Sequence, residues 1–133
     1  MAVATCIQTP TIFARRTIAA AAVIPIGTIM KLEDANTVVV TSGASDPFGG
    51  IAWEESDATS TKTELVVAMD GRWSITTTAA AIPVGNIASI GGANEIELSV
   101  GTADVIVGTQ VGRVLNEIGG GGGTAIVEVG DGN

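Results

Sequence analysis

Few residues of this sequence have the type and spacing that catalysis or metal binding requires. The densest group of carboxylates is Glu54, Glu55 and Asp57. Paired acids can bind calcium or act as general acid and base. The group lacks the Asp-x-Asp-x-Asp-Gly spacing of a calcium loop, and adjacent residues of a strand point to opposite faces. A solvated strand edge is the favoured interpretation, and a metal site is the alternative.

A run of five glycines, Gly119–Gly123, has the composition of a phosphate-binding loop. Such a loop needs a helix N-terminus directly after the glycines and usually a lysine beside them. Here the β-branched segment Thr124–Val129 follows, and no lysine is near. The run is therefore predicted to be a flexible crossing between strands.

Nucleophilic catalysis lacks its usual base, because the chain contains no histidine. Ser42, Ser45 and Ser74 therefore have no partner to activate them. Cys6, the only cysteine, has no histidine or basic partner in the sequence, and we interpret it as a packing or incidental residue. A single cysteine excludes a disulfide within the chain and argues against structural zinc. We expect no enzymatic activity, no cofactor and no bound metal.

The length and the charge of the chain further limit the functional classes to which the protein could belong. The 133 residues predict one domain, and 46% of them are hydrophobic against 15% charged. Fourteen acidic and six basic residues give a net charge of −8, which would repel nucleic acid. No apolar run reaches the roughly 18 residues of a membrane span. Thr17–Ile26 imitates a signal peptide but runs into turn residues, so we expect a cytoplasmic product with neither nucleic acid nor membrane as partner.

The apolar residues predict an all-β fold. Valine and isoleucine together number 30 and leucine only 4, and β-branched residues favour strands. Asp70-Gly71 is the strongest hairpin signal, between Glu64–Met69 and Arg72–Thr78, whereas Ser42–Gly50 has loop composition. Thr28–Leu32 and Thr37–Thr41 are expected to pair as a second hairpin, because the residues between them have turn chemistry. Further strands are expected over Ile51–Glu55, Asp104–Thr109, Val111–Ile118 and Thr124–Val129, with helix-forming composition at Ala19–Ala22 and Leu115–Ile118.

The chain repeats part of its own sequence. Residues 24–43 and 82–101 align at a constant offset of 58, with seven identities in twenty positions, including Ile-Pro-x-Gly and Ala-Asn. Proline fixes φ before a tight turn and glycine supplies a positive φ, so the two turns are predicted in equivalent places. We predict a compact β-sandwich or barrel-like domain over residues 18–133. It would be an internal duplication of a roughly 60-residue β unit, with halves at about 19–78 and 79–130.

Residues 1–17 are predicted to form an extended N-terminal arm, because Pro10 breaks any helix and no periodicity is present. Ile12, Phe13, Arg15 and Arg16 give the arm a composition too apolar for a solvated tail. Two interpretations stay open: an edge strand of the same domain, or an arm that lies on a partner protein. The second makes these four residues candidates for a contact surface.

Trp53 and Trp73 are two of only four aromatic residues. They are interpreted either as core residues or as interface anchors, since tryptophan is enriched at binding hot spots. Arg72, beside Trp73, and Arg113 could each reach an acidic neighbour. These four residues complete the candidate contact surface, which would join the protein to a partner protein or to another subunit.

Several short motifs resemble, in their order and spacing, the small capsid decoration proteins of tailed phages, which are also called cement or capsid-stabilising proteins. The likeness covers roughly residues 20–129 and leaves the arm out. The motifs are Ile-Pro-Ile-Gly (24–27), Phe-Gly-Gly-Ile-Ala-Trp-Glu-Glu (48–55), Val-Ala-Met-Asp-Gly-Arg-Trp (67–73), Ile-Pro-Val-Gly (82–85) and the glycine-interrupted segment 111–129.

This resemblance implies an all-β protein without enzymatic activity that binds the outside of an icosahedral head. It implies the major capsid protein as partner, with neighbouring capsid subunits bridged, and a location on the outer surface of the virion. It also implies a homo-oligomer, for which a trimer is favoured and a dimer stays open. Two other classes remain: a tail-tube or fibre-associated virion module, and a small carbohydrate-binding module, for which four aromatic residues are few.

Overall fold

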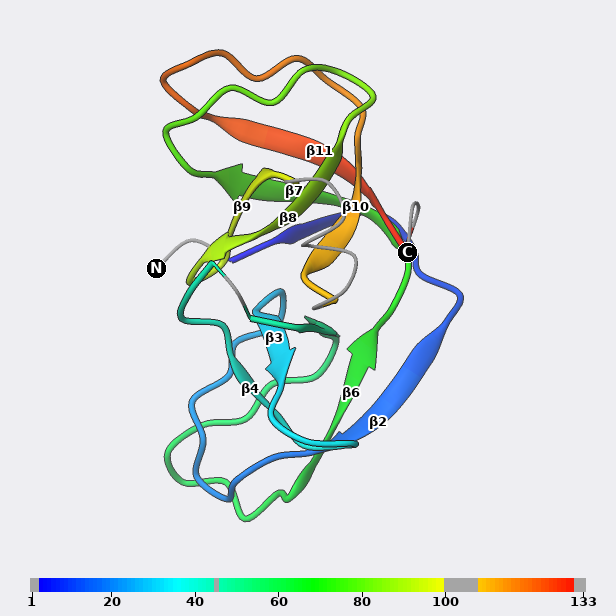
Figure 1. Ribbon diagram of the computed structural model, residues 1–133. Coiled ribbons are helices and arrows are strands. Elements are labelled where there is room, and N and C mark those ends of the chain that lie inside the picture. Colours follow the sequence, from blue (N-terminus) through cyan, green and yellow to red (C-terminus); the bar gives the residue numbers. More distant parts are fainter. Residues whose placement is uncertain (1–2, 45, 100–107, 131–133) are drawn as a thin grey trace.

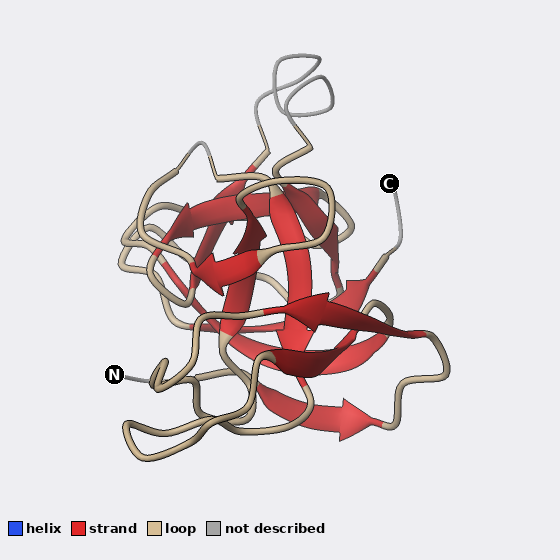
Figure 2. Cartoon of the chain, turned by 90° about the horizontal axis from the view of Figure 1, so that it is seen from below, coloured by secondary structure: helices blue, strands red, loops and turns tan. Residues whose placement is uncertain are grey.

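A computed structural model describes residues 3–44, 46–99 and 108–130 of the chain (Figure 1). The described residues form eleven strands and no helix, so the prediction of an all-β fold is confirmed. Figure 2 shows the described chain as strands joined by loops and turns. The strands are β1 (Thr5–Gln8), β2 (Phe13–Thr17), β3 (Ile29–Leu32), β4 (Val38–Val40), β5 (Phe48–Ala52), β6 (Glu64–Ala68), β7 (Gly71–Thr77), β8 (Ile87–Gly92), β9 (Glu95–Leu98), β10 (Gln110–Val114) and β11 (Thr124–Val129).

The strands build two sheets. One has six strands in the order β1-β7-β11-β10-β8-β9, and a parallel pairing of β7 with β9 closes strands β7 to β11 into a barrel. The other has five strands in the order β2-β6-β5-β3-β4. A single parallel bridge between Thr17 and Thr37 links its two outer strands. The chain crosses between the sheets twice, after β1 and after β6.

The two sheets contain two copies of one structural unit. The first unit is β2 to β6 and the second is β7 to β11, and the strand order is the same in both. Met30 pairs with Gly50 in the first unit, and their equivalents Ala88 and Gly112 pair in the second. Both ladders shift register beside this pair, so the irregularity is duplicated together with the strands.

The two Ile-Pro-x-Gly turns occupy equivalent places. Gly27 and Gly85 have positive φ angles of 93° and 85°. The Gly27 amide donates to the Ala52 carbonyl at 2.8 Å, and the Gly85 amide donates to the Val114 carbonyl at 2.7 Å. Glycine adopts such a φ without steric cost, which explains why both copies carry it.

The boundary between the units lies one strand earlier than the sequence suggested. Each unit begins with the strand before the alanine run, at Phe13 and at Gly71, instead of near residues 19 and 79. Asp70-Gly71 is not a hairpin, because β6 pairs with β2 and β5 whereas β7 pairs with β1, β11 and β9. Gly71 has the expected positive φ of 97°, but the turn sends the chain from one sheet into the other.

The described part of the N-terminal segment, residues 3–17, forms two edge strands and does not leave the body as an arm. β1 pairs antiparallel with β7, and β2 pairs with β6 from Phe13 opposite Ala68 to Thr17 opposite Glu64. The sequence left two interpretations open, an edge strand or an arm on a partner, and the structure agrees with the edge strand. The physical reason is that β6 and β7 would otherwise leave backbone groups unpaired along one side.

Strand β5 begins earlier than its composition suggests. Phe48–Gly50 belong to the strand, although they end a segment rich in loop-forming residues, and all five residues of β5 are buried. A Cβ at Gly49 would meet Val38 Cγ1 at 2.9 Å. The glycine therefore marks a close approach of strands rather than a loop.

Neither segment with helix-forming composition is helical. Residues Ala19–Ala22 lie in a turn. Within Leu115–Ile118, Ile118 exchanges two backbone hydrogen bonds of 3.0 Å with Ile82, which holds it in a bridge. The predicted hairpin of β3 with β4 is confirmed. Most of the expected strand Asp104–Thr109 lies outside the described residues.

Two apolar clusters form the core. The larger joins the inward side chains of the second unit to Ile29, Phe48 and Ile51 of the first, and so packs the units together. The smaller lies within the first unit, and Met69, at the crossing after β6, packs against both clusters. In β11, residues 125, 127 and 129 are buried while Ile126 is exposed, which is the alternation that a half-buried strand requires.

Candidate contact surface at the junction of the two sheets

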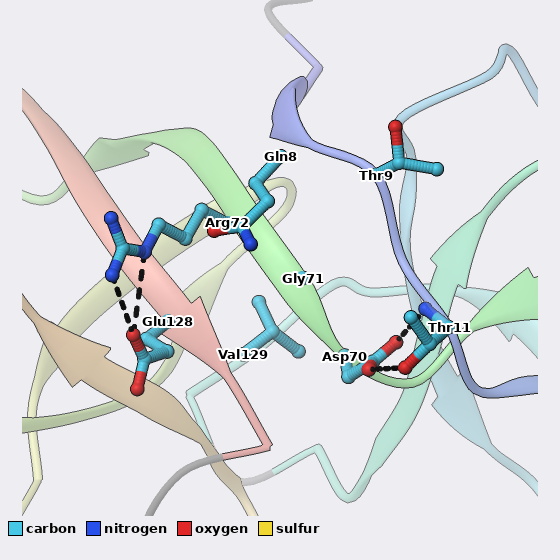
Figure 3. Close-up of a pocket in the computed structure, with 8 residues that line it drawn as sticks. All are labelled: Gln8, Thr9, Thr11, Asp70, Gly71, Arg72, Glu128 and Val129. Atoms are coloured by element: carbon cyan, nitrogen blue, oxygen red, sulfur yellow. Dashed lines mark hydrogen bonds and ion pairs between the residues drawn. The ribbon is translucent and has the colours of Figure 1, made fainter.

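Asp70 fixes the place where the chain passes between the sheets (Figure 3). Its carboxylate accepts hydrogen bonds from the Thr11 amide at 2.8 Å, the Thr11 hydroxyl at 2.6 Å and the Ile12 amide at 2.9 Å. Asp70 lies on the crossing from β6 to β7, whereas Thr11 and Ile12 lie on the crossing from β1 to β2. The carboxylate therefore joins the two crossings and ties the N-terminal segment to the body.

These hydrogen bonds also set the protonation of Asp70. Burial alone raises the pKa of a carboxyl group, but bonds from the Thr11 side chain and from the Ile12 and Thr11 amides outweigh it. The pKa of Asp70 is consequently lowered. A carboxyl group whose pKa is lower in the folded than in the unfolded state stabilises the fold at neutral pH. That contribution is lost as the pH falls below about 4, through the lowered pKa.

An open hollow of about 300 Å³ lies beside Asp70, between β1, the start of β7 and the end of β11 (Figure 3). Across it, Arg72 Nη2 lies 3.3 Å from Glu128 Oε2, and Arg72 Nε donates to the same oxygen at 3.3 Å. Arg72 thus has the kind of acidic neighbour that the sequence suggested, within its own chain. Both side chains are almost half exposed, so the pair stabilises the fold by less than about 1 kcal/mol.

Three of the four aromatic side chains meet at the junction of the two sheets, near the place where the chain crosses between them at Asp70. The ring centroids of Phe13 and Trp53 are 5.6 Å apart, and those of Trp53 and Trp73 are 6.1 Å apart with the planes at 84°. Such an edge-to-face contact is favourable for aromatic rings. Trp73 Nε1 donates to the Asp70 carbonyl at 3.0 Å. The row of rings connects the surface at β2 with the core below it.

Trp73 is not part of a contact surface, which corrects one of its two interpretations. Only 1% of Trp73 is exposed, and it belongs to the larger core cluster. Trp53 is partly buried against the same cluster. Phe13, at the outer end of the row, is 44% exposed.

The exposed apolar side chains concentrate in the N-terminal segment. Ile7 and Ile12 are 54% and 59% exposed, and Phe13 follows directly. We call Ile12, Phe13 and Trp53 the junction patch. Ile12 and Phe13 are exposed neighbours in the chain, and the Phe13 ring contacts the half-buried Trp53. Exposed apolar surface is a common feature of protein interaction sites. The other large exposed apolar residues of the described chain are Val23, Ile26, Val84 and Ile126.

The three remaining arginines of the candidate surface have different environments. Arg15 is exposed on β2, next to the junction patch. Arg16 is only partly exposed; its Nη1 donates to Asn36 Oδ1 at 3.4 Å, and its Nε is buried without a hydrogen-bond partner among the described residues. Arg113 Nη1 donates to the Gly85 carbonyl at 2.7 Å and so supports the second Pro-x-Gly turn. Arg15 is the arginine that the structure leaves beside the patch.

The residues that suggested chemistry have structural roles. Glu54 Oε1 accepts from the Val66 amide at 3.0 Å, and Asp57 Oδ1 accepts from the Thr59 amide at 2.9 Å. Burial raises the pKa of the Cys6 thiol, which reduces its thiolate fraction. In the part of the chain that the structure describes, no group of three or more acidic, histidine or cysteine residues could hold a metal ion.

Searches of protein-family models and of curated proteins found no match to the chain. Among the described residues, no helix is long and apolar enough to cross a membrane.

Sequence reasoning missed Asp70 and Gly71 as the centre of the site. A Cβ at Gly71 would lie 2.8 Å from the Gln8 carbonyl oxygen, so glycine is needed for β1 to approach β7. The Asp-Gly pair was the available signal, and it correctly indicated a positive φ. What it did not indicate is that the partner of Asp70 lies 59 residues away, at Thr11.

Proposed function

We propose that the chain is a structural virion protein that binds the outer surface of an icosahedral capsid and stabilises it by bridging neighbouring major capsid subunits. It acts as a homo-oligomer, with a trimer favoured over a dimer, and without chemistry or a cofactor. The order and spacing of its motifs, which resemble those of phage decoration proteins, support this proposal. The structural observation that carries it is the junction patch.

The patch lies where a mechanical clamp would need it. β1 and β2 belong to different sheets, and Asp70 bonds to the segment between them. A pull on Ile12 or Phe13 is therefore borne by strand pairs in both sheets rather than by a loose tail. Each copy need contribute only a modest interface, because many copies on one shell add their effects.

The direct test uses heads of the phage that encodes the chain, assembled without it, to which the purified protein is added. Ile12→Ser removes exposed apolar surface from the patch. Val84→Ser is the matched control, since Val84 is 56% exposed on the second Pro-x-Gly turn. We expect Ile12→Ser to weaken head binding at least several-fold, because it removes roughly 1–3 kcal/mol of apolar contact, and Val84→Ser to bind as the unmodified chain does.

A second measurement tests stabilisation itself. Decorated heads are expected to rupture at a higher temperature and to survive osmotic shock better than bare heads. Heads that take up no protein, or that are equally robust with and without it, contradict the proposed function. Loss of binding with Val84→Ser but not with Ile12→Ser keeps the function and moves the contact surface to the Pro-x-Gly turns.

A further inference from the structure

The two units differ at one strand edge. In the second unit, the side of β7 away from β11 is covered by β1 at residues 72–74 and by β9 at Thr76 and Thr77. In the first unit, only the far end of the equivalent edge is covered, where Thr17 bridges to Thr37. The positions equivalent to 72–74 are residues 13–15 of β2, and no described strand pairs with them on that side.

The backbone groups of Phe13 and Arg15 point toward this free edge. In an antiparallel pair, successive residues direct their backbone groups alternately to the two sides. The Ile18 amide bonds to the residue before β6 at 2.9 Å, so the even-numbered residues of β2 face β6. The Thr17 amide donates to the opposite side, to the Asn36 carbonyl, also at 2.9 Å. Phe13 and Arg15 share the orientation of Thr17.

The free edge is exposed and partly apolar. Phe13 and Arg15 are both exposed, and Ile12 and Trp53 of the junction patch adjoin them. Figure 1 shows β6 along one side of β2 and no ribbon along the other. An uncovered edge of this kind is a template for a strand of another chain. Added strands use main-chain hydrogen bonds for affinity and side-chain contacts for specificity.

The positive charge of Arg15 indicates which kind of chain could pair with this edge. The ion pairs among the described residues, Lys31–Asp46 and Arg72–Glu128, do not use Arg15. A second copy would present its own Arg15, or the outer edge of β1 or of β4, and neither of those strands contains an acidic residue. An acidic segment of a different protein supplies the missing counter-charge, since oppositely charged residues on neighbouring strands attract.

We propose that the edge of β2 at Phe13 and Arg15 receives an extended segment of the major capsid protein that carries a carboxylate opposite Arg15. The segment adds to β2 as β1 adds to β7. The identity of the partner rests on the proposed function, whereas the position of the edge rests on the fold. Phe13 and the junction patch then cover the apolar side of the incoming strand.

The test removes one outward amide and leaves the sheet intact. Arg15→Pro deletes the amide that faces the free edge, and proline is tolerated on an edge strand when the deleted amide is not bonded within the sheet. Arg15→Thr keeps the amide and removes the charge. On bare heads we expect Arg15→Pro to weaken binding about tenfold or more. Arg15→Thr should bind several-fold more weakly than the unmodified chain and with a smaller dependence on salt.

Hydrogen exchange on the unmodified chain gives an independent readout should Arg15→Pro fail to fold. The Phe13 and Arg15 amides are expected to exchange rapidly in the free protein and slowly on heads, whereas the Ala14 and Arg16 amides, which face β6, are slow in both. Heads that take up Arg15→Pro as well as the unmodified chain, or rapid exchange of both outward amides on heads, overturn the strand pairing alone. Heads that take up no protein overturn the pairing and the proposed function together.

Self-association would identify a different occupant. The free protein is measured by light scattering before and after the Arg15→Pro change. A lower mass for the variant would mean that a second copy covers the edge, which contradicts the proposal. An unchanged mass together with lost head binding supports it.

Discussion

Replacing either turn glycine by alanine separates the cost of backbone strain from the cost of displacing the N-terminal segment. Gly27 and Gly85 are equivalent, with φ angles of 93° and 85°. Alanine at a positive φ costs about 1–2 kcal/mol in either place. A Cβ at Gly85 meets nothing within 4 Å, whereas a Cβ at Gly27 would overlap the carbonyl oxygen of Ala4.

Gly27→Ala therefore has to move the chain that leads into β1. The Ala4 amide donates to the Gly27 carbonyl at 2.8 Å, and Ala4 is 5% exposed. Loss of this hydrogen bond costs about 1 kcal/mol, and exposure of the Ala4 methyl adds a little less. We expect Gly85→Ala to destabilise the fold by about 1–2 kcal/mol and Gly27→Ala by about 3–4 kcal/mol.

Thermal unfolding followed by circular dichroism measures this difference. At roughly 4 °C per kcal/mol for a chain of this size, Gly85→Ala should lower the melting temperature by about 4–8 °C and Gly27→Ala by about 12–16 °C. Amide exchange in β1 should rise in Gly27→Ala alone. Equal melting temperatures for the two variants, or β1 amides as protected as before in Gly27→Ala, would refute the contact between Ala4 and the turn.

Two further predictions concern the N-terminal segment. Asp70→Asn should lower the free energy of unfolding at pH 7 by about 1–2 kcal/mol, because its carboxylate accepts three hydrogen bonds. The difference in free energy of unfolding between the variant and the unmodified chain should disappear below about pH 4, where the carboxyl group protonates. If urea titrations give a difference that does not depend on pH, the role of the charge is contradicted. Deleting residues 1–17 should abolish cooperative unfolding, because it removes β1 and β2. A deletion variant with unchanged circular dichroism and melting temperature would mean that neither strand belongs to the core.

The parts of the fold that the sequence predicted are those with local causes. The hairpin of β3 and β4 is closed by Asp34, whose Oδ1 accepts from the Asn36 amide at 3.1 Å and the Thr37 amide at 3.0 Å. Residues so close in sequence form such a turn without help from the rest of the chain. The repeated Ile-Pro-x-Gly turns are local in the same sense, because a proline and a positive φ are enough to define them.

The closure of the barrel and the junction depend on contacts that no local pattern encodes. The parallel pairing of Thr76 with Glu95 closes the second unit, yet neither residue carries a signal for its partner. At Asp70-Gly71 the sequence predicted the positive φ of Gly71, but it did not predict that the chain passes there from one sheet into the other. Strands β6 and β7 do not pair with each other; β6 pairs with β2 from Glu64 to Ala68, and β7 pairs with β11 from Gly71 to Thr76.

A comparison of equivalent residues in the two units distinguishes features that the fold requires from features that belong to the surface of one unit. Glu54 and Asn116 occupy equivalent places, and each accepts a hydrogen bond from the equivalent amide, of Val66 at 3.0 Å and of Ile126 at 2.8 Å. The side chain has changed from a carboxylate to an amide, but the acceptor has been kept, because an amide at that position must be satisfied in either unit.

At the edges of β2 and β7, by contrast, the two units do not share the same arrangement. Arg72 in β7 is covered by β1 and paired with Glu128, whereas its equivalent in β2, Phe13, has neither a covering strand nor a described polar partner. A unit that only had to fold would keep its uncovered edge polar, because an apolar edge invites aggregation. The exposure of Phe13, which stays at 44% although the ring packs on Trp53, is a cost to the isolated protein. It is explained if the edge is covered when the protein is at work, and that is why the edge of β2 is the place to look for the partner.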